Sequence, residues 1–213
     1  MTPRIGGMRG GRSTVADLEA HMEALLVSIG VVALAEVGDK TQLLAFLLAA
    51  RFRKPVPIIL GILAATIVNH GLAGALGAWI TANVSPEILR WVLGVSFLGM
   101  AVWTLIPDEI EKDEARVAQR FGVFGATLIT FFLAEMGDKT QVATVALAAH
   151  YGSAAVVVVG TTLGMLLADV PAVFIGERLA TRIPMQLVHG VAAAIFALLG
   201  AATLWGAGAP IGL

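Results

Sequence analysis

Cysteine is absent from the 213-residue chain, which excludes disulfide bridges, thiolate metal sites and cysteine nucleophiles. Charged residues are also scarce, at 14% of the chain, and they sum to a formal net charge of −1. This near-neutral balance, without a basic aromatic patch or a Gly-rich phosphate loop, gives no support for binding to nucleic acid. Hydrophobic residues make up 58% of the chain and the mean hydropathy is +0.87. The composition therefore predicts an all-α integral membrane protein.

Six apolar runs are long enough to cross a bilayer, which takes about 17–25 residues. Turns and charged residues separate them, and the longest polar stretch, residues 107–120, carries five acidic side chains followed by Arg116 and Arg120. We interpret this stretch as a linker between two halves, 22–106 and 121–206, although a cation-sensing role is an alternative. Residues 1–21 and 207–213 are predicted to be tails. The six predicted spans are 22–50, 56–80, 88–106, 121–149, 154–177 and 185–206.

A nine-residue motif occurs in both halves. Residues Leu34–Gln42 recur as Leu133–Gln141, with eight identical positions at an offset of 99 residues. Each copy places a Glu, an Asp and a Lys inside an apolar span, and three such charges together cost on the order of 8–10 kcal/mol at a helix centre. A chain that carries this cost twice is predicted to handle ions within the membrane.

The repeat predicts an inverted architecture. Three spans per half is an odd number, so the second half enters the membrane from the opposite side, a plan that many secondary transporters use. The two motifs would then meet near the midplane. Lys and Arg are more numerous on the side of the central linker, eight against four, which predicts a cytoplasmic linker with both termini outside.

The acidic residues of the motifs are candidate cation ligands. Glu36 and Asp39 are three residues apart, as are Glu135 and Asp138, and we expect each pair to share one helix face. Four carboxylates around one small volume must hold protons or a cation. Oxygen ligands suit hard cations such as Ca²⁺, Mg²⁺ and Mn²⁺. The cation would be a transported substrate, and no permanently bound cofactor is expected.

The polar neighbours of these acids allow two interpretations. Gln42, Gln141, Thr41 and Thr140 could add oxygen ligands, or they could form hydrogen bonds between helices. The glycines inside the motifs, at positions 38 and 137, allow close helix packing or a local break that frees backbone carbonyls.

The remaining ionisable residues of the spans are candidates for carrying protons or compensating charge. Lys40 and Lys139 follow the motif glutamates by four residues, the spacing of a helical ion pair, so each could neutralise its own glutamate or replace the absent cation. His70 and Asp169 are equivalent under the 99-residue offset. Each is a functional candidate by its position in the membrane, although a His beside an Asn can also be a hydrogen-bonded core residue. Pro171 could kink its helix or simply pack.

The duplicated Glu-x-Gly-Asp-Lys-Thr motif in two three-span halves resembles the Gdt-type cation/proton exchangers, which include Golgi calcium and manganese transporters and bacterial manganese exporters. The resemblance covers residues 22–206. It implies that the four motif acids are the cation ligands, with the neighbouring Thr and Gln residues along the same pathway. The compact form is similar to the bacterial members, which implies manganese export across the inner membrane.

We therefore expect an antiporter that exports a divalent cation, Mn²⁺ or Ca²⁺, in exchange for protons by alternating access. Its partners would be the cation, protons and lipid, and a homo-oligomer is left open. An intramembrane metal-dependent enzyme is an alternative, although no Ser, Cys or His-Glu-x-x-His constellation accompanies the acids. A passive channel for divalent cations shares the same sequence features.

Overall fold

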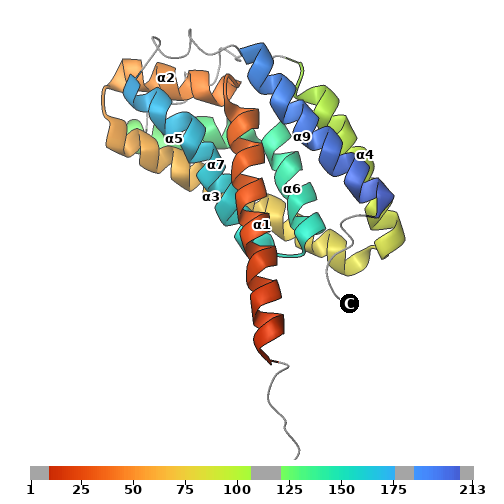
Figure 1. The fold of residues 1–213 in the computed structure, drawn as a ribbon. Helices are drawn as coiled ribbons and strands as arrows, with labels where there is room; N and C mark the ends of the chain where they lie inside the picture. Colours follow the sequence, from red (N-terminus) through yellow and green to blue (C-terminus); the bar gives the residue numbers. More distant parts are fainter. Residues whose placement is uncertain (1–9, 107–120, 176–184, 207–213) are drawn as a thin grey trace, which may run out of the picture.

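The computed structural model describes residues 10–106, 121–175 and 185–206, and these residues are helical apart from short turns (Figure 1). No strand occurs within these ranges. The predicted linker 107–120 and the predicted tail 207–213 lie outside the described residues. The helices are α1 (Gly10–Glu36), α2 (Lys40–Phe52), α3 (Pro55–Asn83), α4 (Pro86–Trp103), α5 (Gly122–Glu135), α6 (Lys139–Tyr151), α7 (Ala154–Ile175) and α9 (Met185–Trp205).

Four of these helices contain stretches long and apolar enough to cross a membrane, namely Val15–Glu36, Pro55–Asn83, Pro86–Thr104 and Ala154–Phe174. Two of the predicted spans are not continuous helices. In place of 22–50 the chain forms α1 and α2, and in place of 121–149 it forms α5 and α6. The sequence left open whether these spans break at Gly38 and Gly137, and the structure has a break at both places. Residues 10–21, assigned to a tail, belong to α1.

Prolines and left-handed residues mark the helix boundaries outside the motifs. Pro55 and Pro86 lie in the first turns of α3 and α4, where the missing N–H is not needed by the helix. At the other end of α2 and α6, Arg53 and Gly152 adopt left-handed conformations with φ of 52° and 63°. Both residues donate their backbone N–H to a carbonyl of the last turn, which is a common helix ending.

Each half packs its first helix against a long helix of the other half. The most extensive contact joins α1 to α7, and the equivalent contact joins α5 to α3. A Cβ built on Gly61 of α3 would lie 2.6 Å from the Thr127 Cβ, and one on Gly160 of α7 would lie 2.7 Å from the Ser28 Cβ. These two contacts are related by the 99-residue offset. Glycine therefore permits the same close approach of backbones in both places.

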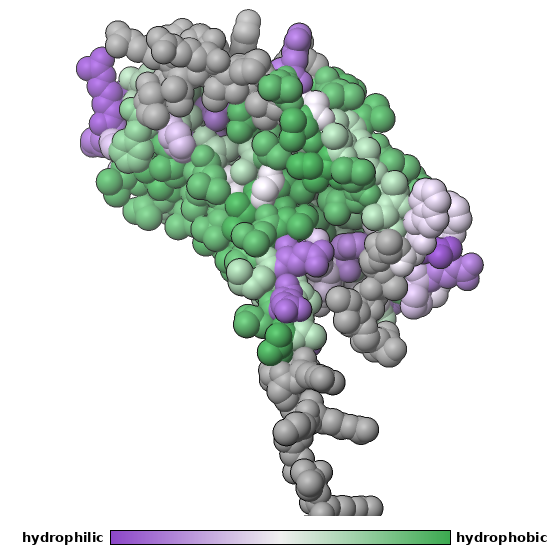
Figure 2. Space-filling view, viewed as in Figure 1, coloured by the Kyte–Doolittle hydropathy of each residue, from purple (hydrophilic) through white to green (hydrophobic). Residues whose placement is uncertain are grey.

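The surface of the described helices is largely apolar (Figure 2). On α3 alone, seven large apolar side chains between Val56 and Trp79 are exposed. Exposed charged residues gather near helix ends. Arg51 lies in the last turn of α2, Arg53 and Lys54 lie between α2 and α3, and Glu87 and Arg90 lie in the first turns of α4. An apolar exterior of this extent is characteristic of a protein surrounded by lipid.

Candidate functional site

Both motifs lie at breaks between two helices. α1 ends at Glu36 and α2 begins at Lys40, while α5 ends at Glu135 and α6 begins at Lys139. Between them the glycines adopt positive φ values, 83° at Gly38 and 78° at Gly137. A Cβ built on Gly137 would meet nothing within 4 Å, so its left-handed backbone, rather than a close contact, requires glycine there.

The break changes the geometry expected for the acids. Asp39 and Asp138 are the N-cap residues of α2 and α6, both with φ −75° and ψ 168°, whereas Glu36 and Glu135 end the preceding helices. The expectation that each Glu and Asp share one helix face was therefore wrong. The acids instead line the break, with the glutamate on one side of the glycine and the aspartate on the other.

Gln42 and Gln141 stabilise the breaks. The Oε1 of Gln42 accepts a hydrogen bond from the Gly38 N–H at 2.9 Å, and that of Gln141 accepts one from the Gly137 N–H at 2.8 Å. Gln42 also donates its Nε2 to the Ala168 carbonyl of α7 at 3.0 Å. The bonds to the glycines resemble the Gln half of a capping box, in which a side chain of the first turn accepts from a backbone N–H before the helix. They fix the short turn that carries the acids.

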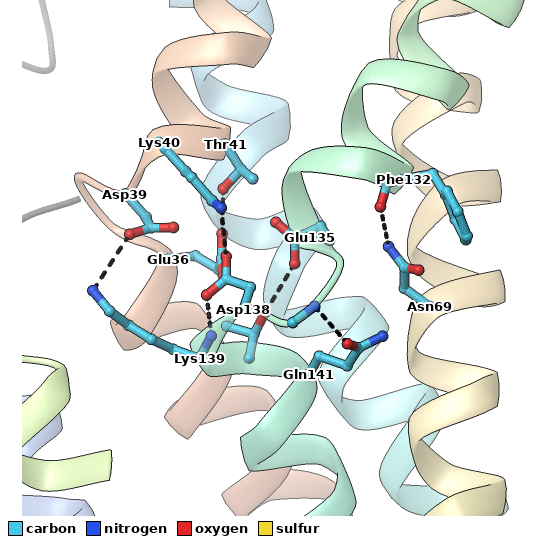
Figure 3. A network of polar contacts seen from close by, with 12 residues as sticks. Glu36, Asp39, Lys40, Thr41, Asn69, Phe132, Glu135, Asp138, Lys139 and Gln141 are labelled. Carbon is cyan, nitrogen blue, oxygen red and sulfur yellow. Dashed lines mark hydrogen bonds and ion pairs between the residues drawn. The ribbon is translucent and has the colours of Figure 1, made fainter. Parts of the chain in front are cut away.

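Thr41 and Thr140 each hold one glutamate. Thr41 Oγ1 donates to Glu36 Oε2 at 2.5 Å, and Thr140 Oγ1 donates to Glu135 Oε2 at 2.9 Å (Figure 3). Within the described part of the chain, the Oε1 atoms of both glutamates are buried and have no hydrogen-bond partner. Each threonine thus orients its glutamate and leaves one carboxylate oxygen available to a ligand.

Three of the four acids converge closely. One carboxylate oxygen each from Glu36, Glu135 and Asp138 lie within 4.8 Å of one another, and all three residues are buried. Asp39, the fourth acid, is also buried, with 3% of its surface exposed. Because like charges at this separation repel strongly at low dielectric, the cluster requires a cation or protons. Its oxygen donors fit a hard divalent cation.

The two lysines link the motifs to each other. Lys40 Nζ lies 3.9 Å from Asp138 Oδ2, and Lys139 Nζ lies 3.9 Å from Asp39 Oδ1 (Figure 3). These ion pairs join one half to the other, whereas the sequence spacing had suggested pairing with the glutamate of the same motif. That spacing applies to a continuous helix, and the helix ends before each lysine.

The lysines differ in their surroundings although their motifs are nearly identical. The Lys139 side chain is 4% exposed and also donates to the Ile106 carbonyl at 3.0 Å, just after α4. The Lys40 side chain is 25% exposed. The site is therefore more accessible on the Lys40 side than on the Lys139 side.

His70 and Asp169 lie on α3 and α7, outside the close cluster. Both are fully buried, and neither the His70 ring nitrogens nor the Asp169 carboxylate oxygens have a hydrogen-bond partner among the residues that the structure describes. The neighbouring Asn69 donates its Nδ2 to the Phe132 carbonyl of α5 at 3.1 Å (Figure 3). Pro171 lies inside α7, which continues to Ile175.

Two backbone carbonyls that contact the site were not identified from the sequence, nor were the starts of α2 and α6 within the motifs. Nothing in the pattern pointed to the carbonyls of Ile106 and Ala168, because the contacts join segments far apart in the chain. The starts of α2 and α6 do have a signal. An Asp followed three residues later by a Gln is typical of a helix N-terminus, and both motifs contain it inside an apolar run.

Comparisons with known proteins identify the family of the chain. The chain matches one protein family, described as divalent cation/proton antiporter GDT1, over residues 24–112 and again over 123–210, so that each half matches separately. It is 54% identical over 186 residues to a Vibrio cholerae protein named "Putative manganese exporter", covering 87% of this chain and 92% of that protein. A rice protein, GDT1-like protein 3, is 30% identical over 200 residues, covering 82% of this chain and 71% of the relative. No solved structure matches the chain.

Proposed function

The chain belongs to the GDT1 family of divalent cation/proton antiporters, and on that premise we propose that it exports Mn²⁺ in exchange for protons. The observation that carries this proposal is the convergence of Glu36, Glu135 and Asp138, buried carboxylates supplied by both halves of an integral membrane protein. A buried group of this charge is stable only when a cation or protons neutralise it. An exchanger requires that the cation and the protons bind to the protein in alternation.

The cation would be held by the acids of both motifs. Glu36 and Glu135 offer the oxygens that their threonines leave available, Asp138 completes the close group, and Asp39 lies at the edge of the site. Carboxylate oxygens accept Mn²⁺ and Ca²⁺ alike. The choice of Mn²⁺ is supported by the name of the Vibrio cholerae relative.

Thr41, Thr140, Gln42 and Gln141 would act mainly by positioning. Their hydrogen bonds hold the glutamates and the helix breaks in place. The carbonyl oxygens near the breaks could complete the coordination of an ion, as they do in other transporters with interrupted helices. Lys40 and Lys139 would compensate the aspartates of the opposite motif when no cation is bound.

Alternating access would come from two inverted halves of three membrane spans each. In this proposal α1 with α2, and α5 with α6, are the interrupted spans, and the reciprocal packing of α1 on α7 and α5 on α3 supports the symmetry. We place the protein in the bacterial inner membrane with its central linker in the cytoplasm and its termini outside. The excess of Lys and Arg on the linker side supports this orientation.

The proposal is tested by transport in reconstituted vesicles with an internal pH probe. Mn²⁺ movement should drive proton movement in the opposite direction, and Glu36→Gln or Asp138→Asn should abolish both while the protein still inserts. Glu19→Gln is a matched control, because Glu19 is an exposed carboxylate on the same helix as Glu36. It should exchange at the wild-type rate. Repeating the measurement with Ca²⁺ gives the cation preference.

Two results would contradict the proposal. Normal exchange by the Glu36→Gln variant would remove the carboxylate cluster from the mechanism. Mn²⁺ movement that does not depend on the pH gradient and moves no protons would identify a passive channel instead, because a channel does not couple cation movement to proton movement.

A further inference from the structure

Asp169 is a buried acid that lies outside both motifs. It lies in α7, its surface is fully buried, and neither carboxylate oxygen has a hydrogen-bond partner within the described ranges. An ionised carboxylate in such surroundings is costly, because no donor replaces the water that burial removes. The side chain therefore needs a bound ion or a proton.

Asp169 is placed beside the site by a defined contact. Gln42, which caps the break in the first motif, donates its Nε2 to the carbonyl of Ala168, the residue immediately before Asp169. α7 packs against α1, which ends at Glu36, and against α6, which begins directly after Asp138. Asp169 is nevertheless not one of the three acids whose oxygens lie within 4.8 Å of one another. A buried charge at Asp169 acts on the cluster from outside this close group, because charges interact strongly at low dielectric.

The charged and titratable groups at the motif ends of the helices around α7 include two lysines, Lys40 and Lys139. The helices packed against α7 are α1, α2, α3 and α6. The lysines of α2 and α6 form their ion pairs with the aspartates of the opposite motif. No ion pair involving Asp169 occurs in the described part of the chain. The groups at the motif ends of these helices are Glu36 of α1, Lys40 of α2 with the preceding Asp39, and Lys139 of α6 with the preceding Asp138. The middle of α3 contributes the buried His70.

The equivalent position in the other half is less suited to carrying a proton beside the cation site. His70 occupies it, and its imidazole becomes a cation when it takes a proton, whereas a carboxyl group becomes neutral. A protonated Asp169 is therefore uncharged when the divalent cation arrives. A proton on His70 would repel that cation.

We propose that Asp169 carries the exchanged proton, beside but apart from the carboxylates that hold the cation. This inference rests on the proposed cation/proton exchange and assigns its two substrates to different side chains. When the cation enters the cluster, its positive charge favours loss of H⁺ from Asp169, and the electron pair of the O–H bond stays on the carboxylate oxygen. When the cation leaves, the carboxylate takes up H⁺ again. Coupling would then be electrostatic and would not require the two substrates to compete for one ligand.

The test separates Mn²⁺ self-exchange from Mn²⁺/H⁺ exchange in reconstituted vesicles. Self-exchange of labelled for unlabelled Mn²⁺ needs the cation cluster but no proton. Asp169→Asn is expected to bind Mn²⁺ with an affinity within about threefold of the wild type and to retain self-exchange, while protons moved per Mn²⁺ fall by at least about tenfold. Asp169→Glu, which keeps a carboxyl group, should restore proton movement.

Controls distinguish this role from packing and from the cation site itself. Thr162→Val is a matched control, because Thr162 is a buried polar residue of α7 whose hydroxyl also has no hydrogen-bond partner in the described ranges. It should leave both kinds of exchange unchanged. Glu36→Gln should lose Mn²⁺ binding and both kinds of exchange. If Asp169→Asn is not recovered as monodisperse protein, Asp169→Thr is tested by the same criteria.

Two results would overturn the inference. If Asp169→Asn, or Asp169→Thr in its place, moved as many protons per Mn²⁺ as the wild type, the proton would be carried elsewhere. Loss of Mn²⁺ binding and self-exchange in that variant would make Asp169 a cation ligand. If the wild-type protein itself moved no protons with Mn²⁺, the proposed exchange would fail, and this result is distinct from either outcome at Asp169.

Discussion

The two lysines provide a sharp test because they occupy equivalent motif positions with unequal burial. In the Lys139–Asp39 pair the side chains are 4% and 3% exposed, whereas Lys40 is 25% exposed beside Asp138. Removing one member of a buried ion pair typically costs about 3–5 kcal/mol, because the remaining charge loses that partner at low dielectric. A partly exposed pair is worth about 1 kcal/mol or less.

We therefore expect Lys139→Met to lower the free energy of unfolding by about 3–5 kcal/mol and Lys40→Met by about 1 kcal/mol, both without metal. The hydrogen bond from Lys139 to the Ile106 carbonyl adds to the difference. Methionine keeps most of the side-chain volume, so the comparison isolates the charge. The measurement is unfolding of the detergent-solubilised protein in the presence of a chelator, with exposed Lys54 changed to Met as the control.

Added Mn²⁺ should restore part of the stability that Lys139→Met loses, because the cation supplies positive charge beside Asp39. Equal losses for the two variants would refute the argument, since their sequence context is nearly identical and only the surroundings differ. A larger loss of unfolding free energy for Lys40→Met than for Lys139→Met would contradict the argument from burial.

Two glycine substitutions test the break and the packing between halves, with Gly30→Ala on α1 as the common control. Gly137→Ala should cost about 1–2 kcal/mol and slow exchange, because its φ of 78° is left-handed although a Cβ would meet nothing within 4 Å. Gly164→Ala should cost about 1–3 kcal/mol, because its Cβ would lie 2.7 Å from the Ile29 carbonyl oxygen and force α1 away from α7. Gly30→Ala, with nothing within 4 Å, should be neutral or stabilising by up to about 1 kcal/mol, and equal behaviour of all three in thermal unfolding would contradict both arguments.

The sequence predicted the composition of the site better than its geometry. The 99-residue offset identified the acids, and both motifs do meet in space through the pairs of Lys40 with Asp138 and Lys139 with Asp39. The helix breaks were left open, because an apolar run containing one glycine is compatible with close packing or with a turn. The deciding quantity is the sign of φ, which depends on the surrounding structure.

The pairing of the lysines could not follow from spacing once the helices ended. A four-residue separation predicts an ion pair only along a continuous helix. The sequence also does not predict that Lys139 is more buried than Lys40, because the segment after α4 that supplies the Ile106 carbonyl lies against Lys139. Nearly identical motifs acquired different surroundings from a segment that lies outside the nine-residue motif itself.

The reciprocal packing of the halves has a consequence for biosynthesis. The contact between Ser28 of α1 and Gly160 of α7 joins residues 132 positions apart. At a synthesis rate of about 5–20 residues per second, roughly 7–26 s separate the appearance of the two partners. During that interval α1, with Glu36 at its end, has reached the membrane without the helix that later covers it. The ribosome therefore completes the first half before α1 can make its contact with α7, and two halves made as separate chains should form this contact only when both are present.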